Sequence, residues 1–172
     1  GIAKGSGMIE PRMATMLGFL TTDAKVEPGV LAGALQRVVN LTFNAITVDG
    51  ECSTNDTVFV MASGASGVVI DESLYPALEA GLRAVSKELA IGIVRGGEGA
   101  TKLVSIRVIG AKDWAHAERA ARTIANSLLV KTAVHGADPN WGRIVAAAGR
   151  SGVMFDINRT TVHVGGVRLF EN

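Results

Sequence analysis

A threonine at position 15 follows a small residue, Ala14, at the end of a glycine-rich loop that is interrupted by Pro11. If the bond between Ala14 and Thr15 breaks, Thr15 gains a free α-amine that titrates close to neutral pH, beside its own hydroxyl. The residue then holds both a nucleophile and a base. In the uncut chain the same nitrogen belongs to a planar peptide bond and cannot accept a proton. Cleavage, by attack of the Thr15 hydroxyl on the Ala14 carbonyl, would therefore activate the site.

Without its neighbours, Thr15 would be interpreted as an ordinary surface or strand threonine, so the flanking motifs decide. Four motifs follow in order: Lys-Gly-Ser-Gly-Met at 4–8 with Met-Ala-Thr-Met-Leu at 13–17, Ser-Thr-Asn-Asp-Thr at 53–57, Gly-Glu-Gly-Ala-Thr-Lys at 97–102, and Val-Lys-Thr-Ala at 130–133 leading into Asp-Pro-Asn-Trp-Gly-Arg at 138–143. In this combination the chain resembles the self-cleaving ornithine acetyltransferases (N-acetylglutamate synthases) of arginine biosynthesis. The match spans nearly the whole sequence.

The resemblance implies acetyl transfer from N2-acetylornithine to glutamate through an acetyl ester on Thr15, with ping-pong kinetics. It leaves acetyl-coenzyme A open as a second acetyl donor, and nothing in the sequence forms an identifiable nucleotide site. It also implies an upstream chain from the same precursor and an α2β2 heterotetramer. Two other hypotheses remain: an amino-terminal-nucleophile aminopeptidase or hydrolase, and a non-catalytic partner subunit.

Lys4 and Glu98 match the family's substrate contacts. Both substrates carry an α-carboxylate, which a lysine can bind, and an ammonium group, which a carboxylate can bind. A solvated loop cation is the commoner role of a lysine. The family's oxyanion donors and its C-terminal polar groups have no counterpart in these 172 residues. We interpret 53–57 mainly as a turn beside the pocket, and 138–142 as a rigid turn before a helix that begins at Arg143.

The composition excludes several other classes of protein. A net charge of +1, with the basic residues scattered along the chain, argues against nucleic acid as a partner. There is no apolar run long enough for a membrane helix, and a single cysteine fits a reducing cytoplasm. The three histidines, at 116, 135 and 163, lack metal-ligand spacing, so we expect no metal and no cofactor. The chain opens at Gly1 without an initiator Met, so either a targeting segment or a whole upstream portion is expected to have been removed or to lie on another chain, and the resemblance implies the latter.

The elements that must position these residues alternate between strands and helices. Apolar runs predict strands at 16–22, 57–61 and 103–109, and apolar residues at helical spacing predict helices from about 28 to 46, from 73 to 93, and from 113 to 128. Gly165 and Gly166 between two short apolar runs predict a hairpin. We therefore expect an α/β fold, a layered sandwich of helices packed on mixed β-sheets, of the amino-terminal-nucleophile type.

A change of domain is expected near residue 111. Residues 1–111 would form the α/β domain that carries the nucleophile, with 1–14 as the end of the upstream chain and Thr15 as the start of the downstream one. Residues 112–172 would form a smaller α+β domain that is truncated at its C-terminus.

Overall fold

The computed structural model describes residues 1–10 and 16–171, which divide into a first unit, Gly1–Ala100, and a second unit, Thr101–Asn172. Ala14 and Thr15 lie outside the described residues. The division falls before the boundary expected at 111, because residues 101–111 pack with the second unit. Ile106 and Val108 contact its apolar core, and Lys102 Nζ donates a hydrogen bond to the His135 carbonyl at 2.9 Å.

A three-stranded sheet forms the centre of the first unit. Strand β1 (Ile2–Lys4) pairs antiparallel with β2 (Leu17–Thr22), and β2 pairs parallel with β3 (Thr57–Ala62). The register sets Lys4 opposite Leu17 and Leu17 opposite Thr57. The last residue of β1 and the first residues of β2 and β3 therefore lie abreast at one end of the sheet, which we call the amino end of β2.

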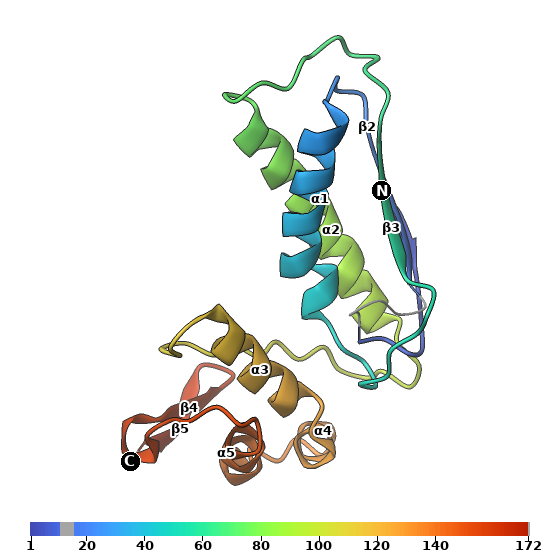
Figure 1. The fold of residues 1–172 in the computed structure, drawn as a ribbon. Helices are drawn as coiled ribbons and strands as arrows, with labels where there is room; N and C mark the ends of the chain where they lie inside the picture. Colours follow the sequence, from blue (N-terminus) through green and yellow to red (C-terminus); the bar gives the residue numbers. More distant parts are fainter. Residues whose placement is uncertain (11–15, 172) are drawn as a thin grey trace. The chain divides into compact units, whose positions relative to one another are not determined.

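Two helices, α1 (Pro28–Leu41) and α2 (Tyr75–Arg95), lie side by side on one face of the sheet (Figure 1). Helix α1 begins where the Glu27 side chain accepts a hydrogen bond from the Val30 amide, and Pro28 sits in its first turn, where its missing N–H costs nothing. Leu20 packs between the helices with Leu31, Ala34, Val38 and Leu82. A second cluster, nearer the amino end of β2, contains Ile9, Met16, Phe43, Ala90 and Ile93.

Helix α1 ends earlier than its apolar spacing predicted. Thr42 donates its hydroxyl to the Val38 carbonyl at 2.7 Å, and the chain then turns into a 3₁₀ segment, η1 (Phe43–Ala45). The prediction of a single helix that reaches residue 46 was therefore wrong. The turn instead buries Phe43 completely in the core.

The other face of the sheet carries exposed apolar side chains. Alternation along the strands points Leu20 inward and Phe19, Phe59 and Met61 outward. The Phe19 and Phe59 rings stack with centroids 5.4 Å apart, yet Phe59 remains 49% exposed. Within the described part of the chain this face is uncovered.

The second unit contains three helices and a hairpin: α3 (Trp114–Ala125), α4 (Leu128–His135), α5 (Trp141–Gly149), a 3₁₀ segment η2 (Ile157–Arg159), β4 (Thr161–Val164) and β5 (Val167–Glu171). Its core contains Ile124, Val130 and Ala147. The hairpin prediction is confirmed, because Gly165 and Gly166 connect β4 and β5 with φ of 58° and 83°.

Two predictions for the second unit were wrong. Residues 103–109 form no strand, because in the described residues no neighbouring strand pairs with them, although Ile106 and Val108 are half-buried. The helix expected from 113 to 128 is interrupted after Ala125. Ser127 starts a new helix there, and its hydroxyl accepts a hydrogen bond from the Val130 amide.

Candidate active site at the amino end of β2

Met16 is the described residue that is bonded to Thr15, and both of its peptide groups are held. Its N–H donates a hydrogen bond to Asp56 Oδ1, and its carbonyl accepts one from the Thr57 amide at 2.9 Å. Its side chain is buried in the apolar core. The chain is thus fixed immediately after the predicted cleavage site, Ala14–Thr15.

Asp56 lies at the start of β3, directly before Thr57. Its Oδ2 atom is buried and has no hydrogen-bond partner among residues 1–10 and 16–171. Burial raises the pKa of the Asp56 carboxyl above its usual value, while the hydrogen bond from the Met16 amide opposes that change. Asp56 therefore contacts the residue that follows Thr15 through one carboxyl oxygen, and its other oxygen has no partner in the described part of the chain.

The segment after Lys4 is held against the same end of the sheet. The side chain of Lys4 is exposed, and its backbone pairs with Leu17. Further along, the amides of Met8 and Ile9 donate to the Asp49 carboxylate at 2.7 and 2.9 Å. Met8 has φ of 54°, in the left-handed region that a methionine seldom adopts, so the Asp49 contacts oppose a local backbone strain.

Glu98 lies on a tight turn that contacts this segment. Its amide donates to the Ser6 carbonyl at 2.9 Å, and a Cβ placed on Gly7 would lie 3.3 Å from Glu98 Oε2. The turn needs its glycines: Gly99 has φ of 70°, and a Cβ on Gly97 would lie 2.8 Å from a Val48 methyl carbon. The structure therefore brings Glu98 to the segment that Lys4 begins.

The motifs at 53–57 and 138–143 form hydrogen bonds that hold a turn, a neighbouring strand and a helix start. In 53–57, the Ser53 hydroxyl accepts a hydrogen bond from the Asn55 amide, as expected for a turn, and Asp56 is the member that reaches another strand. In 138–143, Asn140 caps α5 by accepting from the Arg143 amide at 3.2 Å. That helix begins at Trp141, two residues before the start predicted from the sequence.

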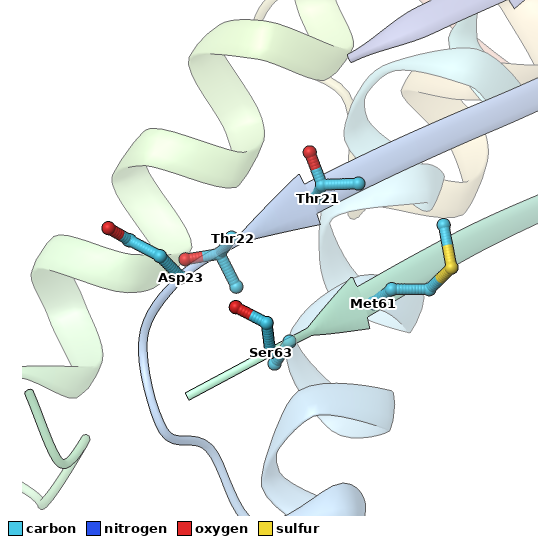
Figure 2. A pocket seen from close by; sticks show the side chains of 6 residues that line it. Thr21, Thr22, Asp23, Met61 and Ser63 are labelled. Atoms are coloured by element: carbon cyan, nitrogen blue, oxygen red, sulfur yellow. The ribbon is translucent and has the colours of Figure 1, made fainter. Parts of the chain in front are cut away.

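A cavity of about 590 Å³ lies at the opposite end of the strands. It is lined by the last residues of β2 and β3 and those that follow, Thr21, Thr22, Asp23, Met61, Ala62 and Ser63 (Figure 2). Six residues of strand span roughly 17 Å, so this cavity is separate from the amino end of β2. In the described ranges, no three His, Cys, Asp or Glu side chains gather as a metal site would need, and no helix has the length and apolarity to cross a bilayer.

Comparison with known proteins decides the family. The model of the ArgJ family matches residues 1–172. The chain belongs to the ArgJ family. The resemblance inferred from the motifs is thus confirmed.

Individual ArgJ relatives agree with this assignment. The chain is 54% identical over 172 residues to the arginine biosynthesis bifunctional protein ArgJ of Parasynechococcus marenigrum, and 53% identical over 171 residues to that of Thermus thermophilus. The two matches cover 100% and 99% of this chain but only 41% and 44% of the relatives' own lengths. The chain therefore spans about two fifths of the length of these relatives.

A solved structure confirms the fold class. The crystal structure of ArgJ from Bacillus halodurans superimposes with a TM-score of 0.87 at 43% identity, covering 91% of this chain and 75% of that one. The mixed α/β fold expected from the sequence is the fold that the ArgJ relative shares. The comparisons do not assign residues, so the roles of Lys4, Ala14, Thr15 and Glu98 stay predictions.

Proposed function

We propose that this chain carries the nucleophile of a glutamate N-acetyltransferase, which moves an acetyl group from N2-acetylornithine to glutamate in arginine biosynthesis. The observation that supports this most is the amino end of β2. There, Met16 is fixed directly after Ala14–Thr15, and the Lys4 segment contacts the Glu98 turn. Membership of the ArgJ family supports the same activity.

The first step is cleavage between Ala14 and Thr15. The Thr15 hydroxyl attacks the Ala14 carbonyl, an ester replaces the peptide bond, and water then releases the upstream chain with a free carboxylate. Thr15 becomes an amino terminus whose nitrogen can accept a proton. The fixed Met16 peptide groups limit the movement of the new terminus, which favours attack from one geometry.

The second step is acetyl transfer. Thr15 Oγ attacks the acetyl carbonyl of N2-acetylornithine while its proton passes to the Thr15 amine. The carbon–nitrogen bond then breaks, and the departing ornithine amine takes that proton. Glutamate next attacks the acetyl ester through its own amine, gives up a proton, and leaves as N-acetylglutamate, while Thr15 Oγ regains its hydrogen.

Lys4 and Glu98 would hold the amino-acid substrates. The exposed ammonium of Lys4 suits the α-carboxylate of either substrate, and the exposed carboxylate of Glu98 suits a substrate ammonium. No metal or cofactor takes part in this scheme, and acetyl-coenzyme A would enter only as an additional acetyl donor. The proposed enzyme is cytoplasmic. Its two chains are cut from one precursor and assemble as α2β2.

The test replaces Thr15 in the whole precursor. In T15A we expect one uncut chain by intact mass and no N-acetylglutamate from N2-acetylornithine and glutamate. T15S keeps the hydroxyl and the new amine, so partial cleavage and partial transfer should survive. T21A, at an exposed threonine of β2, is the matched control and should behave like the unaltered protein.

Three outcomes would contradict the proposal. Full activity of an uncut T15A chain would indicate a structural subunit. Release of free acetate with no N-acetylglutamate would indicate a hydrolase. An acetyl group found by mass spectrometry on any residue other than Thr15 would disprove the acetyl-threonine intermediate.

A further inference from the structure

Glu98 is exposed on a turn, so the position of its carboxylate depends on what holds that turn. A glutamate side chain has several rotamers, and a site that leaves it unrestrained loses affinity to the entropy of ordering it. If Glu98 binds a substrate ammonium, residues that restrict its carboxylate contribute to binding without touching the substrate.

Ser6 holds the backbone of the turn at two points. Its carbonyl accepts a hydrogen bond from the Glu98 amide at 2.9 Å, and its hydroxyl donates one to the Gly96 carbonyl at 3.3 Å. The two bonded residues of the turn flank Gly97 in sequence. The bonds therefore limit the movement of the turn, and with it the direction in which the Glu98 side chain leaves the backbone.

Gly7 leaves space for the Glu98 carboxylate. A Cβ at position 7 would lie 3.3 Å from Glu98 Oε2, which is closer than such atoms ordinarily approach. Among the described residues outside 6–8, no other atom lies within 4 Å of that point. The φ angle of Gly7 is outside the left-handed region, so a left-handed backbone is not what requires glycine here. The missing side chain is matched to the carboxylate.

Val48 supports both segments. Its amide donates a hydrogen bond to the Ile9 carbonyl at 2.6 Å, and a Cβ on Gly97 would lie 2.8 Å from one of its methyl carbons. The segment that follows Gly7 and the turn therefore contact the same residue. This shared support limits their movement relative to each other, as the precise placement of a binding group requires.

We propose that Ser6 and Gly7 are positioning residues for substrate binding: Ser6 fixes the turn that carries Glu98, and Gly7 leaves the space in which the Glu98 carboxylate is held for a substrate ammonium. This inference rests on the proposed function. In N2-acetylornithine the α-amine is acetylated, so the ammonium is the one on its side chain. After cleavage Ser6 and Gly7 would belong to the upstream chain and Glu98 to the downstream chain, and both chains would form this part of the site.

The test is G7A in the whole precursor, at a fixed and saturating concentration of glutamate. The added methyl group displaces the Glu98 carboxylate without removing its charge. We expect G7A to cut itself, to raise KM for N2-acetylornithine roughly three- to tenfold, and to keep kcat within about twofold. G81A is the matched control, because Gly81 is exposed on α2 and no described atom lies within 4 Å of an added Cβ. It should leave both constants unchanged.

A double-mutant cycle shows whether Gly7 acts through Glu98. E98Q removes the charge, so G7A added to E98Q should raise KM by less than about twofold more. Effects that multiply would overturn the inference, because Gly7 would then act by another route. S6A removes the hydroxyl bond to Gly96 and adds no atom. Its KM for N2-acetylornithine should rise about two- to threefold with Tm nearly unchanged, because the bond is exposed.

The readouts separate failure of the inference from failure of the proposed function. If the unaltered protein transfers no acetyl group, or if E98Q alone has normal kinetics, the proposed function or its use of Glu98 fails, and the inference fails with it. If E98Q is impaired while G7A and S6A keep the normal KM, only the inference is overturned. It is also overturned if G7A lowers kcat and Tm together at normal KM, which would indicate a structural role. Should G7A not cut itself, S6A decides: a raised KM at unchanged Tm supports the inference, and a normal KM overturns it.

Discussion

The parallel strands β2 and β3 have two polar ends that are built in different ways. At the amino end, carboxylates bind backbone amides about 40 residues away in sequence: Asp56 holds Met16, and Asp49 holds Met8 and Ile9. At the carboxyl end, Thr22 accepts a hydrogen bond from the amide of Ala24, only two residues away, at 3.2 Å. Both ends join segments that are distant in sequence. The amino end does so through carboxylate side chains, whereas the long-range bonds of the carboxyl end use backbone groups and the Ser66 hydroxyl, which donates to the Asp23 carbonyl at 2.9 Å.

A hollow at the end of a sheet need not be the site of chemistry. In α/β proteins, ligands usually bind beyond the carboxyl ends of parallel strands, and the cavity of about 590 Å³ lies there. The residues expected to react or bind lie at or beside the other end, because the predicted nucleophile precedes β2 instead of following it. The carboxylate–amide contacts, and not the cavity volume, point to the candidate site.

The largest effect in this comparison is expected at Glu98. E98Q keeps the size of the side chain and the backbone bond from its amide to Ser6, but it removes the charge proposed to bind a substrate ammonium. We expect kcat/KM for N2-acetylornithine to fall roughly ten- to a hundredfold with Tm unchanged, because charge-assisted hydrogen bonds contribute about 1.5–3 kcal/mol. Steady-state kinetics and thermal melts measure both.

E88Q, at an exposed position of α2, is the control for E98Q and should leave kinetics and stability unaltered. K4M extends the same test to the substrate carboxylate. It should raise KM for glutamate more than it lowers kcat. Normal kinetics in both E98Q and K4M would remove these side chains from the proposed site.

A smaller effect is expected at Asp49, which binds backbone instead of substrate. D49N keeps one acceptor oxygen and loses the other together with the charge, so the amides of Met8 and Ile9 compete for what remains. Because Asp49 is exposed, we expect the free energy of unfolding to fall by only about 1 kcal/mol. Denaturant titration measures this change, and hydrogen exchange should show faster exchange at Met8 and Ile9 specifically. Exchange spread evenly over the first unit would contradict the assigned contact.

Local patterns in the sequence predicted much of the fold. The strands at 17–22 and 57–62, the helix at 75–95 and the glycine hairpin follow from apolar spacing and turn chemistry within a few residues. The segment 103–109 has the alternating pattern of a strand but no partner strand in the described residues. Alternation within one segment does not indicate whether a second strand lies beside it. Helix α1 ends where the Thr42 hydroxyl donates a hydrogen bond to a carbonyl of the same helix. Apolar spacing does not indicate such a contact.

The site was predicted less completely because its contacts are distant in sequence. The motif at 53–57 was interpreted as a turn, which its first residues form, but the contact of Asp56 depends on the parallel register between β2 and β3. One signal was available: an acidic residue stands directly before an apolar strand. Without the register, nothing indicated that this strand lies beside the one that follows Thr15.

The smallest effect on turnover is expected at the carboxyl end. A double variant there tests whether this end takes part in the reaction. In the double variant T22V/S63A both hydroxyls are lost from the cavity lining, while the backbone bond from the residue 63 amide to the Thr22 carbonyl, at 3.0 Å, can persist. The bonds from the Ala24 amide to Thr22 Oγ and from the Ala65 amide to Ser63 Oγ disappear, so stability should fall by about 1 kcal/mol. Turnover and both KM values should stay within about twofold, because no step of the proposed reaction uses this end. A tenfold loss of kcat with unchanged stability would place the cavity in the active site and would show that the two ends of β2 act together.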